Sequence, residues 1–543
     1  MLSATTWVPR GFPAEYPIKY ELDEEEMQRI SEMAKLQLEE AQEDLDEAKD
    51  VEKKINKMKE GSDDEDDIAN DEDLKEYDME HYDDTDGEED DASGGKGLAM
   101  FGNLKSVAYH EPGEKDPYIT VDPEEEEEEK EELRVLPTDN MILAAKTEDD
   151  VSFMEVYVYD DNPETEDGGP KNDLYVHHDF MLPSFPLCVE WLDYRVGKAR
   201  EEGNPDQPGN FCAIGTFEPE IEVWNLDVVD SAFPDLILGQ RPENADTESN
   251  TVKMSKKKKK KALSKKLNDE YHIDAVLSLS ANRSHRNLLV SGSADTTVKL
   301  WDLNNGSCAK SFQFHGGKVS SVNWNPREST VLLSGGYDAH AIVSDLRTDD
   351  KEGQRKWKVD GDIEGVKWSP NGQDFYVSTE NGRVYKFDAR KPGSSVWTLQ
   401  AHDSEVSSFD INPFVEDYMV TASTDKTVKL WNLSAESSKK GPSMILSRDL
   451  DIGKVFSVGF APDREVFGHI VAAGSGGDVK VWDTMTNRVV REAMGKKKLQ
   501  EFASKENADE KIVGLPDEEE EEESDDDEVD EDQDEEEDSD EEV

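Results

Sequence analysis

The sequence predicts an all-β protein, a seven-bladed β-propeller, and three observations support this fold class. The stretch LLVSGSADTTVKLWDL at 288–303 recurs as YMVTASTDKTVKLWNL at 418–433. Each copy is an apolar run, a polar turn with an Asp, and a second run that alternates up to a Trp, which is the pattern of a β-hairpin. The Trp301 position recurs at intervals of 43, 43, 44 and 51 residues, at Ser344, Phe387, Trp431 and Trp482. A period of about 40–45 residues with four strands per unit is typical of propeller blades.

The repeats resemble the WD40 repeat at VKLWDL, VKLWNL and VKVWDT. Seven blades follow from counting the residues at the Trp position, which are Tyr159, Trp224, Trp301, Ser344, Phe387, Trp431 and Trp482. A second apolar series confirms the register, because its five members all end expected inner strands, at Trp191, Trp324, Trp368, Ile411 and Phe460. Seven blades close a ring without a free sheet edge.

The first two blades are divergent. We expect blade one to contain MILAAKTEDDVSFMEVYVYDD, with LYVHHDF as its outer strand, and blade two to have its inner strand at 187–191 and its third at 221–224. Residues 104–109 and 117–121 have strand composition and are candidates for an extra outer strand. Which segment closes the ring stays open.

Charge and composition set the limits of the folded part. Only 34% of the 543 residues are apolar and the formal charge is −68, whereas globular chains are about 45–50% apolar. Residues 1–130 hold 44 acidic and 14 basic side chains, and 517–543 hold 22 acidic and no basic ones. We therefore expect the propeller at 131–495, a linker at 496–516 and solvated acidic arms at 61–130 and 517–543.

The N-terminal segment, residues 1–20, is aromatic and proline-rich, with Trp7, Pro9, Phe12, Tyr16 and Tyr20. Such a segment has little prospect of folding alone and is expected to dock, either onto the chain's own propeller or, as the sharper hypothesis, onto a partner. Residues 23–60 follow with apolar residues at steps of three and four, which predicts an amphipathic helix. Asp23 and Glu26 resemble a capping box at its start.

Histidines recur four residues before the first inner-strand Val. In WD40 repeats such a His links the turn Asp, a strand Ser or Thr and the Trp in one hydrogen-bond network. The resemblance therefore implies a structural network in the blades, made of His272, Asp295, Trp301, His315, Asp338, His402, Asp425, Trp431 and Trp482. A catalytic use is disfavoured, since the trios repeat around the ring instead of converging in one cleft.

No enzyme activity, metal or cofactor is expected. The glycine-rich GSGG at 474–477 lacks a following Lys-Ser or Lys-Thr, and DEYH at 269–272 has no accompanying nucleotide-binding motif. Cys188, Cys212 and Cys308 are too scattered for a zinc site or a disulfide framework. Neither a signal peptide nor a membrane span is evident, so an intracellular protein without a membrane or small-molecule partner is expected.

A basic insert at 251–268 interrupts the acidic chain between blades two and three. Its core is the run Lys256, Lys257, Lys258, Lys259, Lys260 and Lys261, which indicates nuclear localisation or contact with an RNA backbone. Ser62, Ser524 and Ser539 lie in acidic surroundings that suit an acidophilic kinase. The acidic tail either holds basic proteins such as ribosomal proteins or histones, or keeps the chain soluble.

The segment SATTWVPRGFPAEYPIKY, followed by an acidic helix, resembles the amino terminus of the periodic tryptophan protein 1 family. This resemblance implies a nucleolar, non-enzymatic scaffold in ribosome biogenesis that acts in pre-rRNA processing and large (60S) subunit assembly, with pre-60S assembly factors and ribosomal proteins as partners. Two rivals remain: a histone-binding chromatin factor, and a ubiquitin-ligase substrate receptor. The second would use an Asp-x-Arg after the repeat Trp, as at 345–347 and 388–390, but Ser344 and Phe387 replace the preceding Trp.

Overall fold

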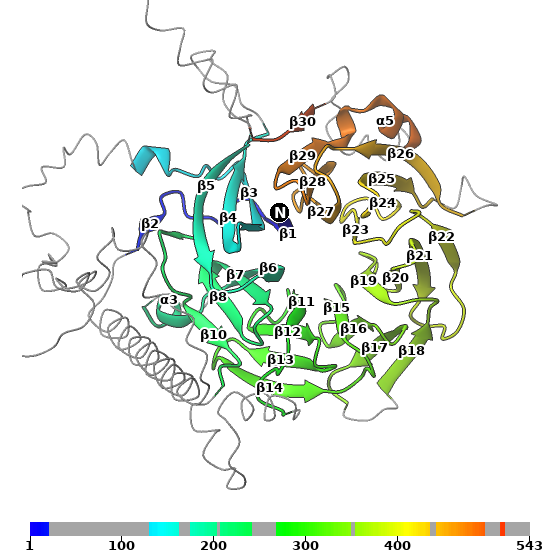
Figure 1. Cartoon of the computed structure of the whole chain (residues 1–543), viewed down its shortest axis with the longest axis horizontal. Helices are drawn as coiled ribbons and strands as arrows, with labels where there is room; N and C mark the ends of the chain where they lie inside the picture. The colour runs from blue at the N-terminus through cyan, green and yellow to red at the C-terminus, as the bar shows by residue number, and fades with distance from the viewer. Residues whose placement is uncertain are drawn as a thin grey trace, which may run out of the picture. The chain divides into compact units, whose positions relative to one another are not determined.

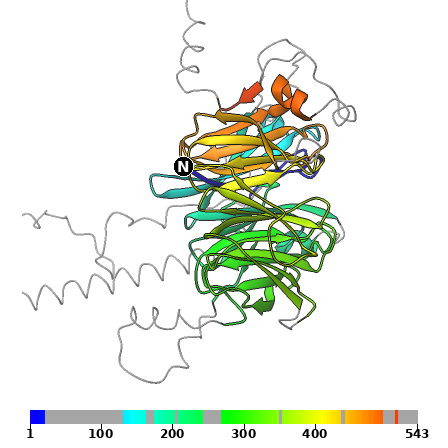
Figure 2. The same ribbon diagram turned by 90° about the vertical axis from the view of Figure 1, so that its right-hand side faces the viewer.

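The structure, a computed structural model, describes residues 1–20, 130–161, 174–202, 207–241, 268–348, 353–434, 441–494 and 511–515. These residues form a ring of seven four-stranded antiparallel sheets (Figure 1). Figure 2 shows the ring from the side. The predicted seven-bladed propeller is confirmed, and the blades are numbered here in ring order from the N-terminus.

Blades 1 to 3 are given from the inner to the outer strand. Blade 1 has β1 (Leu2–Val8), β3 (Asn140–Glu148), β4 (Val151–Tyr159) and β5 (Leu174–Leu182). Blade 2 has β6 (Pro186–Tyr194), β7 (Pro208–Thr216), β8 (Ile221–Asn225) and β10 (Leu236–Leu238). Blade 3 has β11 (Val276–Ala281), β12 (Leu288–Ser293), β13 (Val298–Asp302) and β14 (Ser307–Phe312).

Blades 4 to 7 repeat the same order. Blade 4 has β15 (Val319–Trp324), β16 (Val331–Gly336), β17 (His340–Asp345) and β18 (Gln354–Lys358). Blade 5 has β19 (Ile363–Trp368), β20 (Asp374–Thr379), β21 (Arg383–Asp388) and β22 (Trp397–Gln400). Blade 6 has β23 (Ser408–Ile411), β24 (Tyr418–Ala422), β25 (Thr427–Asn432) and β26 (Ser443–Asp449). Blade 7 has β27 (Val455–Phe460), β28 (His469–Gly474), β29 (Val479–Asp483) and β30 (Lys511–Val513).

The two faces of the ring differ in the connections they carry. The tight turns between the second and third strands, such as the turn of Asp295, lie on one face, which we call the hairpin face. The connections between the first and second strands, such as 282–287, lie on the opposite face, which we call the loop face. Thr296 and Lys426 have positive φ values of 74° and 70° in their turns, since a tight hairpin turn needs this backbone region.

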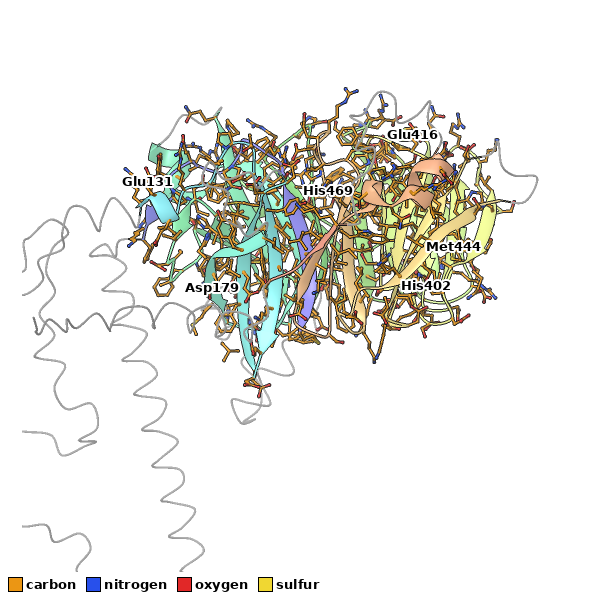
Figure 3. All side chains as sticks on the ribbon, turned by 90° about the horizontal axis from the view of Figure 1, so that it is seen from above. Glu131, Asp179, His402, Glu416, Met444 and His469 are labelled. Atoms are coloured by element: carbon orange, nitrogen blue, oxygen red, sulfur yellow. The ribbon has the colours of Figure 1, made fainter. Side chains whose placement is uncertain are left out.

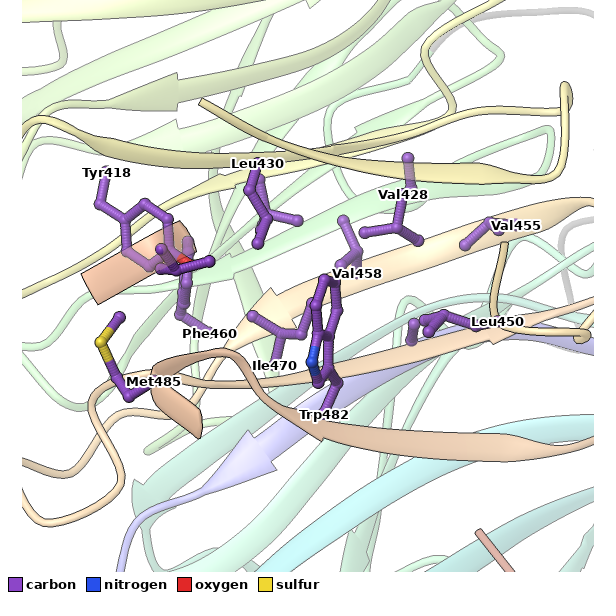
Figure 4. Close-up of a cluster of buried hydrophobic side chains, with 14 of the residues drawn as sticks. Tyr418, Val428, Leu430, Leu450, Val455, Val458, Phe460, Ile470, Trp482 and Met485 are labelled. Carbon is purple, nitrogen blue, oxygen red and sulfur yellow. The ribbon is translucent and has the colours of Figure 1, made fainter. Parts of the chain in front are cut away.

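Apolar side chains fill the space between neighbouring blades. Between blades 6 and 7, Trp482 packs in a cluster with Leu430, Leu450, Val458 and Ile470 (Figure 4). Trp482 is fully buried. Full burial of one large apolar side chain contributes about 1.5–3 kcal/mol, so such clusters hold the blades together around the ring.

Both ends of the described chain take part in closing the ring. β1 pairs with β3 as the inner strand of blade 1, with Trp7 opposite Ile142. β30 pairs with β29 as the outer strand of blade 7, with Ile512 opposite Trp482. The propeller therefore extends beyond the expected 131–495, because 2–8 and part of the expected linker 496–516 are strands of its sheets.

A few short elements lie outside the blades. The two-residue strands β2 (Ile18–Lys19) and β9 (Val228–Val229) pair in parallel. The helical elements include α3 (Gly197–Glu202), the 3-10 helix η7 (Thr484–Thr486) and α5 (Arg488–Met494). No helix in the described ranges is long and apolar enough to cross a membrane.

Several predicted features lie outside the described residues. They are the amphipathic helix at 23–60, the acidic arm up to residue 129 with the strand candidates 104–109 and 117–121, the insert up to residue 267, and the tail 517–543. Ser62, Ser524, Ser539 and the lysines Lys256 to Lys261 fall in these segments.

Candidate functional site

Blade 3 contains a complete hydrogen-bonded network of the expected kind. His272 lies before β11, and its Nδ1 is 2.8 Å from Asp295 Oδ2 in the hairpin turn. Its Nε2 is 2.7 Å from Ser291 Oγ on β12. Trp301 on β13 donates from Nε1 to the same Ser291 Oγ over 2.8 Å. All four side chains are buried, so each polar atom needs a partner within the protein.

The electrostatics of this network favour a neutral His beside a charged Asp. Burial lowers the pKa of His272, although the hydrogen bond to Asp295 opposes the shift. Burial alone would raise the pKa of Asp295, but the hydrogen bonds from His272 and Thr297 outweigh it and lower the pKa to about 2. The network therefore pairs a neutral imidazole with a charged carboxylate, and its hydrogen bonds stabilise the blade.

Blade 6 repeats the network, and blade 4 repeats part of it. His402 lies 2.9 Å from Asp425 and 2.8 Å from Thr421 Oγ1, to which Trp431 donates over 2.9 Å. In blade 4, His315 lies 3.1 Å from Asp338 and 2.8 Å from Ser334. The fourth position there is Ser344, whose buried Oγ has no hydrogen-bond partner among the described residues.

The prediction that Trp482 belongs to such a network is wrong. Its Nε1 is buried without a hydrogen-bond partner in the described part of the chain. The reason lies ten residues upstream, where blades 3 and 6 have Ser291 and Thr421 and blade 7 has Ala472. The indole is held by packing instead, with the Arg448 guanidinium carbon 5.5 Å from its centroid.

The N-terminal aromatic segment docks on the chain's own propeller. Trp7 is only 7% exposed and donates from Nε1 to Gly459 O over 3.2 Å. Phe12 packs edge-on against Trp191, with ring centroids 4.7 Å apart. The hypothesis that Trp7 and Phe12 anchor a partner is therefore corrected, because their rings are used within the fold. Pro9, directly after β1, belongs to the same docked segment.

The two tyrosines of this segment are more accessible. Tyr16 is 37% exposed, with Lys130 Nζ 5.1 Å and the Arg134 guanidinium carbon 5.6 Å from its ring centroid. Tyr20 is half-buried, and its N–H donates to Val229 O over 3.0 Å. Only this end of the segment leaves aromatic surface for a partner.

A belt of hydrogen bonds joins the inner strands of neighbouring blades at four of the seven blade junctions, and it was not predicted. Serines on one blade accept from backbone N–H groups of the next blade, in the pairs Ser278–Val322, Ser321–Val366, Ser408–Val458 and Ser457–Thr5, at 3.1–3.2 Å. Each of these serines stands two residues after a Val at the inner strand, as VLS, VSS, VSS and VFS. That spacing is the signal from which the belt could have been predicted.

Acidic side chains gather near the channel on the hairpin face. Tyr337 donates from its hydroxyl to Glu364 over 3.3 Å. Burial, followed by the charge of Glu405, raises the pKa of Glu364 to about 7. Burial, followed by the charge of Glu364, raises the pKa of Tyr337 to about 12. This face therefore carries a carboxyl group that holds its proton more tightly than usual.

The remaining candidates form no reactive constellation in the described part of the chain. GSGG lies at the turn between β28 and β29, and DEYH leads into β11. Cys188, Cys212 and Cys308 are free thiols, and burial raises the pKa of each. Within the described ranges, no group of three or more His, Cys, Asp or Glu side chains is placed to hold a metal ion.

Comparisons with known proteins agree with this architecture. The model of the WD domain, G-beta repeat, matches residues 266–302, 306–345 and 393–432. Such propellers are typically non-catalytic scaffolds for protein interactions. The chain is 43% identical over 552 residues to periodic tryptophan protein 1 of Saccharomyces cerevisiae, which covers 95% of this chain and 93% of the relative.

Two further relatives extend the comparison. The chain is 45% identical to an uncharacterised WD-repeat protein of Schizosaccharomyces pombe, over 95% of this chain and 94% of the relative. It is 32% identical to the periodic tryptophan protein 1 homologue of Drosophila melanogaster, over 80% and 84% of the two chains. With this identity maintained over nearly the whole length, the chain belongs to the periodic tryptophan protein 1 family.

Proposed function

We propose that this protein is a non-enzymatic WD40 scaffold in nucleolar ribosome biogenesis, where it acts in pre-rRNA processing and large (60S) subunit assembly. The observation that carries the proposal is family membership over 95% of the chain, which is far more than the WD40 repeats alone. A fold alone does not give a function, so the departures from the repeat carry the specific roles.

The charge distribution suits a role among basic proteins and RNA. The acidic tail at 517–543 offers many carboxylates for ribosomal proteins, whose charge is opposite. The run Lys256–Lys261 offers contacts to the pre-rRNA backbone or an import signal for nuclear and then nucleolar localisation. These charged segments join the ring next to Arg241, Asn268 and Leu515, which are the nearest described residues.

Sedimentation of nuclear extract tests the proposal. We expect the protein to migrate with large pre-ribosomal particles and to leave them when pre-rRNA synthesis is stopped. A protein found only in free fractions would contradict the proposal, and one found on nucleosomes would favour the histone-binding alternative.

Replacement of the six lysines Lys256–Lys261 by Ser tests localisation. We expect the variant to stay in the cytoplasm, whereas Ser replacement of the shorter cluster Lys496–Lys498 serves as the matched control. Nuclear entry of the six-Ser variant at the rate of the unchanged protein would rule out this segment as the import signal.

The ubiquitin-ligase alternative has less support in the geometry. Arg347 and Arg390 each fold back on the Asp two residues before, Arg347 Nη2 at 2.6 Å from Asp345 Oδ2 and Arg390 Nε at 2.9 Å from Asp388 Oδ1. Both arginines are thus engaged within their own turns, although their side chains are 71% and 62% exposed. Copurification with a ubiquitin ligase adaptor, lost in Arg347→Ala, would favour this alternative.

A further inference from the structure

A cavity of about 360 Å³ lies at the outer edge of blades 1 and 2. Its lining includes His177, His178 and Asp179 of β5, Asp230 after β9, and Lys19 and Glu132 on either side of the segment 21–129. Its volume is near the lower end of the roughly 300–1,000 Å³ typical of ligand pockets. In Figure 3, Asp179 and Glu131, the neighbour of Glu132, lie on the same side of the propeller.

A β-bulge brings two neighbouring histidines together in this wall. Val156 of β4 pairs with His178 of β5, but the next residue, Tyr157, pairs with Val176, so His177 is the extra residue. Successive side chains of a regular strand point to opposite faces, and a bulge changes this direction. As a result, His177 Nδ1 and His178 Nδ1 are 2.7 Å apart.

The hydrogen bonds fix which nitrogen carries each proton. His177 Nε2 is 2.8 Å from Leu133 O, and a carbonyl oxygen only accepts, so Nε2 carries the proton. In a neutral ring, His177 Nδ1 is then the acceptor, and His178 Nδ1 donates to it. His178 Nε2 is left with a free lone pair. Burial lowers the pKa of both rings, that of His178 to about 3, which keeps both neutral.

This last acceptor has no donor within the described residues. His178 is 8% exposed, and its Nε2 is buried without a hydrogen-bond partner there. A buried polar atom without a hydrogen-bond partner is unfavourable, so a donor at this position would stabilise the protein. The lining carboxylates of Glu132, Asp179 and Asp230 outnumber the single ammonium of Lys19. A donor that is also a cation fits both features.

We propose that this cavity, the blade-1 edge pocket, binds the guanidinium or primary ammonium group of a basic protein segment, with His178 Nε2 accepting one hydrogen bond and Glu132 and Asp230 supplying opposite charge. Guanidinium carries five donors in a planar fork, which suits one ring acceptor together with flanking carboxylates. An RNA phosphate offers neither a donor nor a positive charge. The pocket does not require the ribosomal role, so a failure of one proposal leaves the other standing.

Titration of the full-length protein with a short Gly/Ser peptide that carries one arginine tests the proposal. Isothermal calorimetry and the ring ¹⁵N shift of labelled His178 are the two readouts. We expect binding that moves the Nε2 shift, and at least tenfold weaker binding of the same peptide with citrulline, a neutral isostere of arginine. N-acetyl-arginine amide should bind more weakly than the peptide, because the segment contributes beyond the side chain.

Three variants separate the pocket from general electrostatics. His178→Phe keeps a buried ring without the acceptor and should weaken the arginine peptide at least tenfold. Asp230→Asn should weaken it about fivefold and keep the fold, because Asn tolerates the positive φ of 60° at this position. Glu218→Gln, an exposed acid after β7 in blade 2, is the matched control and should change binding less than twofold.

Several outcomes would overturn the proposal. Equal binding by Asp230→Asn and the unchanged protein, or by the citrulline peptide, would show that the pocket does not recognise the cation. No binding together with an unmoved His178 shift would show that the cavity holds water only. If N-acetyl-arginine amide bound as tightly as the peptide, the ligand would be a small molecule and not a protein segment. If an RNA oligonucleotide displaced the peptide and reversed the shift of His178, the ligand would be a nucleic acid.

Discussion

The indole Nε1 of Trp7 donates to the carbonyl oxygen of Gly459 over 3.2 Å, although the two residues are 452 positions apart in the chain. The same bond joins Trp324 to Ser280 and Trp368 to Asn323 on neighbouring blades. Trp7 is therefore the blade 1 member of the inner-strand aromatic series. It closes the hydrogen-bonded belt between the last blade and the first.

Loss of this ring closure should destabilise the whole propeller. Trp7→Ala is expected to lower the free energy of unfolding by about 3–5 kcal/mol, as for truncation of other buried aromatic side chains. Tyr16→Ala, at an exposed position in the same segment, should change it by less than about 0.5 kcal/mol. Urea denaturation of both variants measures the difference, and equal effects would mean that Trp7 is not packed as described.

A matched pair of Trp→Phe substitutions separates the network from packing. Trp431→Phe leaves Thr421 without its indole donor, whereas Trp482→Phe removes an Nε1–H that has no acceptor among the described residues. Both changes remove a similar volume. We expect Trp431→Phe to cost about 1–2 kcal/mol more in the free energy of unfolding. Equal costs in denaturant titrations would show that the indole hydrogen bond contributes nothing to stability.

The sequence could predict the blades but not the ends of the ring. Blades 3 to 6 and the first three strands of blade 7 follow from the 43–51 residue period, because in each case the strands follow one another closely in the sequence. The inner strand of blade 1 was missed because its paired strand β3 begins only at Asn140, and a local sequence pattern cannot connect two segments so far apart in the chain. A signal was nevertheless present: WVP at 7–9 matches WNP at 324–326 and WSP at 368–370.

Other features of the structure cannot be predicted from the spacing of the repeats. The sequence places His177 and His178 on one strand, but only the bulge opposite Val156 and Tyr157 brings their Nδ1 atoms together. β30 has three residues between acidic and polar stretches, too few for a recognisable alternation. The absence of Trp482 from the network was readable in the sequence, since Ala472 replaces the acceptor hydroxyl.

The raised pKa of Glu364 leads us to expect that the stability of the protein depends on pH between 4.5 and 7. Its folded pKa of about 7, raised by burial and then by Glu405, Glu380 and Asp362, exceeds the ordinary value of 4.5. The contribution of the Glu364 carboxyl group to stability is therefore fully present below pH 4.5, and it is lost as the pH rises through 7. After allowance for solvent screening, the free energy of unfolding of Glu364→Gln at pH 8 should exceed that of the unchanged protein by about 1–2 kcal/mol.

The same substitution should have little effect at acid pH. Near pH 4.5 the wild-type carboxyl is largely protonated in the folded chain and about half protonated in the unfolded one, so Glu364→Gln and the unchanged protein should be nearly equal in stability. Urea titrations at pH 4.5, 6 and 8 trace the difference. A gain that does not change with pH would show that it arises from packing and not from the carboxyl proton.

Two truncations separate the C-terminal strand from the acidic tail. One chain ends after Leu515 and the other after Glu510, directly before β30. The longer chain keeps β30, with Val513 and Leu515 packed on the cluster between blades 7 and 1. The shorter chain loses that packing and the pairing of Val481–Asp483 with Lys511–Val513.

We expect the cut after Leu515 to change the free energy of unfolding by less than about 0.5 kcal/mol, because a run of like charges contributes no core. The cut after Glu510 should cost about 2–4 kcal/mol from lost apolar burial and strand hydrogen bonds. It also exposes the outer edge of β29, and an unpaired edge strand promotes self-association. Denaturant titration measures the change in stability, and analytical ultracentrifugation measures the self-association. If the two chains behaved equally, β30 would not contribute to closing the ring.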